Sequence, residues 1–339
     1  MARRETLDVM RAVFVLVLFL AACSNQPNAA TSPTPTPSAT STTAAPSPTP
    51  TASSSPSPSP ISLPSIAQIS APSATVVWAL VGGTRLFRSS DRGDTWAERS
   101  LPTGLANIEV AFVDDRNGLL LAAGTPATQC QTQTVTIWRT TDGAGTWQQL
   151  APSGIADAKC KHGLASGDAT HAFFTASTPT DPAVIYRTAD GGSSWQSSAP
   201  LLAPPGDTTV FAMPSRPRAI GSVVLLDATG GQQSKDVFRS SGSGATFSFA
   251  SKVPTFEGTV AYVTATRWLQ IAPPSASMET TDGGASWHAY TTDYTQAAPI
   301  APDIVFGDAS AGYATVRGSI QRTTDGGAHW TAIKTPGTG

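Results

Sequence analysis

The sequence has few charged residues, few histidines and hardly any long apolar runs. Lys, Arg, Asp and Glu make up only 13% of its 339 residues, and the formal net charge is −2. A nucleic-acid partner calls for a strongly basic face, so this charge balance argues against one. The histidines, His162, His171, His288 and His329, are scattered, and no phosphate-binding loop or nucleotide fingerprint occurs. We therefore expect no metal site and no cofactor.

The one apolar run that stands out lies at residues 12–20, behind three arginines. It is too short for a permanent membrane helix, which needs about 20 residues, so residues 1–23 are predicted to be a cleaved secretory signal. The run closes in Leu20-Ala21-Ala22-Cys23, which resembles the lipobox of bacterial lipoproteins. That resemblance implies lipidation of Cys23, membrane anchoring and an extracytoplasmic location. The alternative is an ordinary signal with a chance cysteine.

Residues 24–62 are rich in Ser, Thr, Pro and Ala, and no Lys, Arg, Asp or Glu occurs between positions 24 and 60. Such a segment buries too little apolar surface to offset the entropy of ordering, so it is predicted to be disordered. Its prolines favour polyproline II, which makes a semi-rigid spacer. The folded domain is then expected over residues 63–336.

Cysteine is also scarce, with three in the chain. If Cys23 takes the lipid, Cys130 and Cys160 remain as an even pair in an oxidising compartment, where disulfides persist. We predict a disulfide between them. In the chain-entropy model, a loop of this size stabilises the fold by about 3–4 kcal/mol.

One short phrase is repeated six times. The copies are SSDRGDTW, TTDGAGTW, TADGGSSW, SSGSGATF, TTDGGASW and TTDGGAHW, and they end at Trp96, Trp147, Trp195, Phe247, Trp287 and Trp330. The spacings are 51, 48, 52, 40 and 43 residues. A period of about 45 residues indicates one supersecondary unit per repeat, and such units bury a core only by packing side by side.

Each repeat reads as four short strands. In the last copy, an apolar strand from residue 304 is followed by a turn, strands at 312–316 and 319–323, the TDGG turn and a strand from Trp330. Six antiparallel meanders arranged radially give an all-β fold, a six-bladed β-propeller of four-stranded blades. A seven-bladed propeller is the alternative.

The phrase resembles the Asp-box, or BNR repeat, of sialidases and related propellers, whose pattern is S/T-x-D-x-G-x-S/T-W. The matching residues are Asp91 and Trp96, Asp142 and Trp147, Asp190 and Trp195, Asp282 and Trp287, and Asp325 and Trp330. We expect each carboxylate to accept N–H bonds inside its turn and each following glycine to take positive φ. Each tryptophan should pack between sheets. The role of the boxes is thus structural.

Two copies depart from the pattern. The fourth has Gly242 in place of Asp and Phe247 in place of Trp, and the second has Ala144 at a glycine position. An arginine precedes five boxes, at Arg88, Arg139, Arg187, Arg239 and Arg322, and Glu279 takes that place in the fifth blade. A residue repeated in this way is expected to support a neighbouring blade, with an anion-binding ring as the alternative.

The resemblance to sialidases implies an exo-sialidase-like glycoside hydrolase as one alternative. Sialidases share an Arg-Ile-Pro motif, an arginine triad and a Tyr nucleophile paired with a Glu, and this sequence has no Arg-Ile-Pro. The carboxylates near the inner strands and blade starts, Glu109, Asp114, Asp168, Glu257, Asp303 and Asp308, follow no recognisable catalytic order. We therefore assign no catalytic residue.

The pattern Phe-x-Asp-x-x-x-Gly at residues 112–118 and 306–312 is similar to that of the photosystem II assembly-factor family. This similarity favours a non-catalytic, monomeric binding or assembly scaffold for a protein or glycan at the cell envelope, which contacts the membrane only through its lipid. Variable loops opposite the boxes should bind the partner. The candidate residues on that face are Phe256, Tyr290, Asp293 and Tyr294.

Overall fold

The computed structural model describes residues 67–230, 235–273, 275–295 and 302–338. The expected signal peptide, Cys23 and the Ser/Thr/Pro-rich spacer lie outside these residues. The described part is built from β-strands, with a short 3-10 helix at Thr128–Cys130. No helix in it has the length and apolar character needed to cross a membrane.

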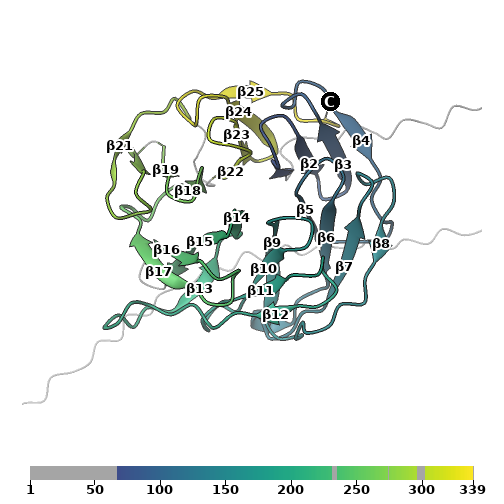
Figure 1. Cartoon of the computed structure of the whole chain (residues 1–339), viewed down its shortest axis with the longest axis horizontal. Coiled ribbons are helices and arrows are strands. Elements are labelled where there is room, and N and C mark those ends of the chain that lie inside the picture. Colours follow the sequence, from purple (N-terminus) through teal and green to yellow (C-terminus); the bar gives the residue numbers. More distant parts are fainter. Residues whose placement is uncertain (1–66, 231–234, 274, 296–301, 339) are drawn as a thin grey trace, which may run out of the picture. The chain divides into compact units, whose positions relative to one another are not determined.

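Six antiparallel sheets are arranged in a ring, so the domain is the expected six-bladed β-propeller (Figure 1). Each blade comes from one continuous stretch of chain, and no seventh sheet occurs in the described ranges. The strands are β1 (Ala67–Ser70), β2 (Val77–Val81), β3 (Arg85–Ser89) and β4 (Ala97–Arg99) in blade 1; β5 (Ile108–Phe112), β6 (Gly118–Ala123), β7 (Val135–Thr140) and β8 (Gln148–Gln149) in blade 2; β9 (Cys160–Ser166), β10 (Ala172–Ser177), β11 (Val184–Thr188) and β12 (Gln196–Ser197) in blade 3; β13 (Phe211–Pro214), β14 (Arg218–Ile220), β15 (Val223–Gly230), β16 (Lys235–Ser240) and β17 (Ser248–Lys252) in blade 4; β18 (Thr259–Tyr262), β19 (Trp268–Ile271), β20 (Ser277–Thr280) and β21 (His288–Tyr290) in blade 5; and β22 (Asp303–Phe306), β23 (Gly312–Val316), β24 (Ser319–Thr323) and β25 (Thr331–Ile333) in blade 6.

Each blade packs against both of its neighbours. In β2, Val77, Ala79 and Val81 face blade 6, whereas Trp78 and Leu80 face blade 2. Because successive side chains point to opposite faces of a strand, a strand held between two neighbours is apolar at every position. Six hydrophobic clusters result, one at each blade–blade interface. The cluster between blades 6 and 1 closes the ring.

The boxes form a repeated turn between the third and fourth strands of a blade. In blade 1 the Ser89 hydroxyl donates to Asp91 (2.6 Å) and accepts the N–H of Gly93 (2.8 Å). Asp91 also accepts the N–H and the hydroxyl of Thr95, at 2.9 and 2.5 Å. The same bonds recur in blades 2, 3 and 5, and in blade 6 with His329 in the Thr95 position. The Ser89 hydroxyl and then the Thr95 groups lower the pKa of Asp91 to about 2.

Two consecutive residues of every box have positive φ. The values are 65° at Arg92 and 89° at Gly93, and 74° at Gly143 and 61° at Ala144. A left-handed residue with a Cβ costs about 1–2 kcal/mol, which explains why glycine fills most of these positions. The departure at Ala144 is therefore tolerated at the cost of local strain.

The box aromatics connect each blade to the one before it. The indole N–H of Trp147 donates to Ser100 O of blade 1 (2.9 Å), and that of Trp287 donates to Ser251 Oγ of blade 4 (3.0 Å). All six box aromatics belong to the hydrophobic cluster between their own blade and the preceding one. The aromatic ring that ends each box thus fastens neighbouring sheets, as expected.

Several residues that precede the boxes reach the opposite way, toward the next blade. Arg322 donates to Arg92 O (2.9 Å) and pairs with Asp94 (2.7 Å) in the box of blade 1. Arg88 pairs with Asp115 of blade 2 at 3.3 Å. These contacts support the structural interpretation of the repeated arginine over an anion-binding ring.

Blade 5 makes the equivalent connection with different residues. Glu279, which stands where the arginine is expected, pairs with Arg267 at 2.6 Å. Arg267 in turn donates from Nη2 to Gly326 O in the box of blade 6 (3.0 Å). The link between blades is kept although its residues have changed.

Blade 4 lacks the box carboxylate. The Ser240 hydroxyl still accepts the N–H of Gly244 (3.0 Å), but Gly242 offers no side chain to the N–H and hydroxyl of Thr246. The inner strand of this blade is also divided, because β13 and β14 both pair with β15. Blade 4 is thus the irregular blade of the ring.

We predict that Gly242→Asp stabilises the domain. Gly242 does not have positive φ, and a Cβ at this position would meet no atom within 4 Å, so an aspartate fits without strain. Its carboxylate would restore the missing bonds, and a gain of about 1 kcal/mol raises the melting temperature by about 2–4 °C. Gly242→Ala is the matched control, because it restricts the unfolded chain without adding an acceptor.

Thermal unfolding measures this gain as a function of pH. The pKa of Asp142 in the equivalent turn is about 2, whereas the unfolded value is 3.8. A depressed pKa gives stability that is complete above the unfolded value, so the part of the gain that exceeds that of Gly242→Ala should vanish as the pH falls from about 4 to about 2. An equal rise for Gly242→Ala, or no rise for Gly242→Asp, would contradict the role assigned to the box carboxylate.

Candidate functional site

The inner strands of all six blades surround a central cavity of about 630 Å³. This volume lies in the range of sites that hold small molecules or a few side chains. Blade 4 contributes a large part of the lining, through residues 213–220 and the strands behind them. The charged side chains that line the cavity are Arg216, Arg218, Asp227, Lys235, Asp303 and Asp308.

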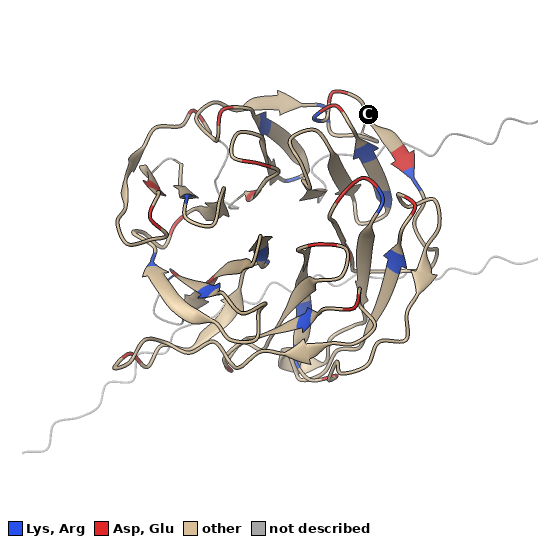
Figure 2. Ribbon diagram, in the orientation of Figure 1, with Lys and Arg blue, Asp and Glu red and all other residues tan. Residues whose placement is uncertain are grey.

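The segment 215–218, Ser-Arg-Pro-Arg, lies where the inner strand of blade 4 breaks, and we call it the blade-four finger. Proline has no N–H to give to a strand ladder, so Pro214 and Pro217 favour a break at this position. The following strand, β14, lies at the middle of the ring (Figure 1) and carries a basic residue there (Figure 2). The finger therefore brings two arginines into the cavity.

Blade 3 leaves room for the finger by using glycine. Gly163, in β9, has φ of 72°, and a Cβ on it would lie 3.1 Å from Arg216 Cα. A Cβ on Gly167 would lie 3.0 Å from the Cβ of Ala219. These close approaches hold the finger against β9 at a fixed depth in the cavity.

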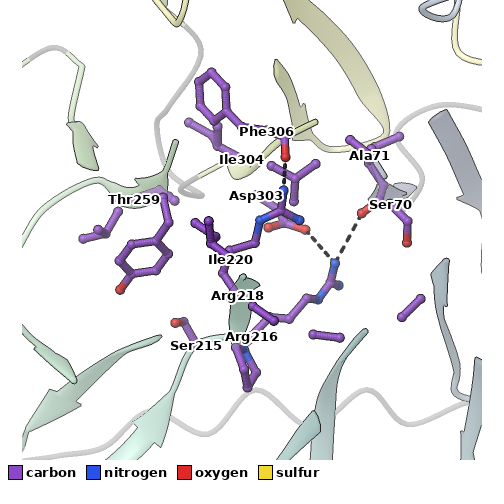
Figure 3. Close-up of a pocket in the computed structure, with 18 of the residues that line it drawn as sticks. Ser70, Ala71, Ser215, Arg216, Arg218, Ile220, Thr259, Asp303, Ile304 and Phe306 are labelled. Atoms are coloured by element: carbon purple, nitrogen blue, oxygen red, sulfur yellow. Dashed lines mark hydrogen bonds and ion pairs between the residues drawn. The ribbon is translucent and has the colours of Figure 1, made fainter. Parts of the chain in front are cut away.

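The two arginines span the cavity from blade 4 to blades 1 and 6. Arg216 Nη1 donates to Ile69 O (3.4 Å) and lies 3.6 Å from Asp303 Oδ2. Arg218 Nη2 donates to Phe306 O. Figure 3 shows both guanidinium groups extending from the finger to these partners. The finger thus ties three blades together across the central axis.

Positive charge in the finger is only partly balanced. Burial, followed by repulsion from Arg216, lowers the pKa of Arg218 to about 10, and attraction to Asp303 opposes this shift. Arg218 remains charged near neutral pH. Its recorded hydrogen bond goes to a backbone carbonyl and not to a carboxylate. The finger therefore places two cations beside one acidic partner.

A second polar pair lies where blade 4 meets blade 5. The Tyr262 hydroxyl lies 3.3 Å from Asp227 Oδ1, and Lys235 Nζ donates to Gly258 O (2.5 Å). Burial raises the pKa of Asp227, while attraction to Lys235 opposes this shift. Burial, assisted by Asp227, raises the pKa of Tyr262 well above its ordinary value. The tyrosine is thus kept as a neutral phenol.

The carboxylates expected near the inner strands are mostly engaged in turns. Asp114, Asp168 and Asp308 each accept two backbone N–H groups in the first turn of their blades, at 2.6–2.8 Å. Glu109 accepts the N–H of Leu164 (2.7 Å). Glu257 accepts the hydroxyl of Ser275 (2.7 Å), and Asp303 pairs with the finger. The sequence reasoning missed Asp227 and both finger arginines, although the two prolines beside them are an unusual signal in a strand.

Of the residues expected on the binding face, Tyr294 is buried, Tyr290 is half-buried and Asp293 is exposed. Their role in binding a partner stays a prediction. Tyr294 is only 2% exposed and packs edge-on against Trp330. Asp293 accepts the N–H of Trp330 (2.8 Å), and the Tyr290 hydroxyl donates to Gly326 O (3.2 Å). These residues brace the box of blade 6, because the chain after an outer strand continues along the next blade's box.

Phe256 is 43% exposed and belongs to a different surface. Met213 and Lys235 flank Thr229 on adjacent strands, and Lys235 Nζ lies 5.8 Å from the centre of the Phe256 ring. Met213 is 61% exposed and lines the cavity, as Lys235 does. We call Met213, Lys235 and Phe256 the blade-four rim. It lies at the end of the blade opposite the box and borders the central cavity.

Cys130 and Cys160 form a disulfide, with their Cα atoms 5.0 Å apart. It joins the loop between β6 and β7 of blade 2 to the start of β9 in blade 3. The N–H of Gln133 donates to Asp157 O (2.7 Å) in the same pair of segments. The disulfide therefore reinforces a connection between blades that hydrogen bonds also make.

In the described ranges no group of three or more His, Cys, Asp or Glu side chains could hold a metal ion. The geometry that does stand out is a closed propeller with regular boxes, one modified blade and a cavity crossed by two arginines. These features define the class of the protein as a six-bladed β-propeller, and its repeated turns resemble the Asp-box.

No protein-family model and no curated protein matches the sequence. Among solved structures, AofleA from Arthrobotrys oligospora is 14% identical, with a TM-score of 0.50 over 80% of this chain and 87% of that one. YCF48 from Cyanidioschyzon merolae is 15% identical, with a TM-score of 0.48 over 80% and 86%. The GH74 enzyme of Niastella koreensis is 14% identical, with a TM-score of 0.45 over 77% and 46%. At these identities the similarity concerns the fold alone.

We predict that Gly163→Ala weakens the domain by displacing the finger. The added Cβ meets the Arg216 backbone and also makes the left-handed φ costly. Gly221→Ala is the matched control, since Gly221 has φ of 59° and open space around it. Each backbone penalty is about 1–2 kcal/mol, so Gly163→Ala should lower the melting temperature more than Gly221→Ala does. If thermal unfolding gives the same decrease in melting temperature for both variants, the close approach of the finger to β9 does not contribute to stability.

Proposed function

We propose that the protein is a non-catalytic scaffold that binds a protein partner at the cell envelope through blade 4. The observation that carries this proposal is the distribution of exposed apolar side chains. All five large apolar side chains that are exposed in the described residues fall within residues 202–256: Leu202, Val210, Met213, Phe249 and Phe256. Apolar surface concentrated in this way is typical of a protein–protein contact.

Blade 4 is also the most irregular of the six blades. Its box has lost the carboxylate, its inner strand is divided, and the finger and the rim both belong to it. Loops and irregular segments on a rigid scaffold are where binding residues usually gather. The other blades supply the rigid ring, and blade 4 supplies the contact surface.

A lipid anchor completes the proposal. The lipobox-like sequence at residues 20–23 supports attachment through Cys23, and the uncharged spacer would hold the propeller away from the membrane. Cells carrying Cys23→Ala should release the protein from the membrane fraction. Continued membrane association of that variant would contradict the anchor.

A glycoside hydrolase is the second candidate, because Tyr262 and Asp227 form a hydroxyl–carboxylate pair in the cavity. A tyrosine nucleophile must lose its proton readily, whereas burial raises the pKa of Tyr262. This opposes catalysis of the sialidase kind. Turnover of a fluorogenic glycoside that is abolished by Asp227→Asn would favour the enzyme over the scaffold.

We predict that a photo-crosslinking residue at position 256 captures one discrete protein partner in cells. Benzoylphenylalanine replaces Phe256 with a side chain of similar character, so the surface keeps its apolar contact. Position 149 is the matched control, because Gln149 is also exposed but lies on the outermost strand of blade 2, β8, outside residues 202–256. Immunoblots measure the adducts. Equal adducts at both positions, or none at position 256, would contradict the proposed surface.

A further inference from the structure

The blade-four finger holds more hydrogen-bond donors than its protein partners use. Arg216 bonds through Nη1, and Arg218 bonds through Nη2. The Nε atoms of both arginines are buried, and neither has a hydrogen-bond partner among the described residues. Buried donors without partners lower the stability of the fold unless a ligand or water accepts their hydrogen bonds. The finger is therefore an incomplete site.

The acidic groups of the cavity do not complete it. Asp308 is occupied by the N–H groups of Ser310 and Ala311, and Asp227 contacts Tyr262. Asp303 lies 3.6 Å from Arg216, which is longer than a charge-assisted hydrogen bond of about 2.7–2.9 Å. A further negatively charged acceptor in the cavity would improve this balance.

The arginines are also held in place before any ligand arrives. Pro214 precedes the finger and Pro217 lies within it. β14 pairs with β15 from Arg218 to Ile220, and Gly163 allows the Arg216 backbone to lie against β9. A guanidinium that is already positioned loses little freedom when it binds a planar anion. Pre-organised donors of this kind are a feature of binding sites.

We propose that Arg216 and Arg218 bind the carboxylate of an acidic side chain that a protein partner inserts into the central cavity. The proposal rests on the proposed function and names the chemistry of its contact. Arginine presents donors in a fork that matches the two oxygens of a carboxylate. The apolar rim formed by Met213 and Phe256 beside the same cavity favours a peptide, with an apolar residue next to the acidic one, over a sugar acid.

Isothermal titration calorimetry on the purified full chain tests this site with small probes. Acetyl-Leu-Glu-amide should bind, and the isosteric acetyl-Leu-Gln-amide should bind at least about tenfold more weakly, because its side-chain amide cannot form a charge-assisted hydrogen bond with the arginines. Galacturonate tests the alternative source of the carboxylate. Binding of galacturonate without binding of the glutamate peptide would overturn the proposal.

Substitutions test whether Arg216 binds the carboxylate of the peptide. Arg216→Gln should reduce the affinity for the glutamate peptide about tenfold or more. Arg216→Lys should retain part of that affinity, because lysine keeps the charge but lacks the two-donor geometry of the guanidinium. Arg116→Gln is the control, because it removes the same charge from an exposed turn in blade 2. Thermal unfolding of each variant confirms that it is folded. Equal affinity of folded Arg216→Gln and Arg116→Gln would overturn the site.

These outcomes separate this inference from the proposed function. A crosslinked partner at position 256 whose capture is unaffected by Arg216→Gln, together with no peptide binding, would remove the carboxylate site and leave the scaffold. Peptide binding that depends on Arg216 without any crosslinked partner would leave a carboxylate site on a protein whose partner contacts lie elsewhere.

Discussion

A hydroxyl and a carboxylate two residues apart bond the backbone N–H groups of a tight turn, and the ring depends on the repetition of this arrangement. In blade 3, Thr188 and Asp190 hold the turn so that Trp195 enters the interface with blade 2. When the turn is fixed, the indole of the tryptophan is fixed as well, and the indole holds the two neighbouring sheets against each other. A local set of hydrogen bonds thereby positions each blade against the one before it.

Blade 4 has lost part of this constraint and has gained the features that a binding site needs. Without the box carboxylate, its turn relies on Ser240 and on packing around Phe247. Its inner strand crosses toward the axis, where Arg218 bonds to blade 6 and replaces some of the missing restraint. Under the proposed function, stability and recognition are divided between the five regular blades and the irregular blade 4.

The sequence predicted the ring because its signal is local and repeated. The strands expected at 312–316 and 319–323 are those found in blade 6, since glycine turns and apolar alternation mark their ends. The candidate site could not be found in this way. The Arg216 backbone lies close against Gly163 of blade 3, and Tyr294 is buried in the interface with blade 6, where it packs against Trp330. Such facts arise from packing between repeats, which a periodic pattern does not encode.

The central claim is that box carboxylates lock five turns and leave the turn of blade 4 open. Amide hydrogen exchange of the full chain, resolved to single residues, tests it most directly. The account predicts slow exchange at the N–H of Thr146, which bonds to Asp142 at 3.0 Å, and much faster exchange at the equivalent Thr246. Equal protection at these two amides would show that the carboxylate does not hold the turn, and the division between the regular blades and blade 4 would fall with it.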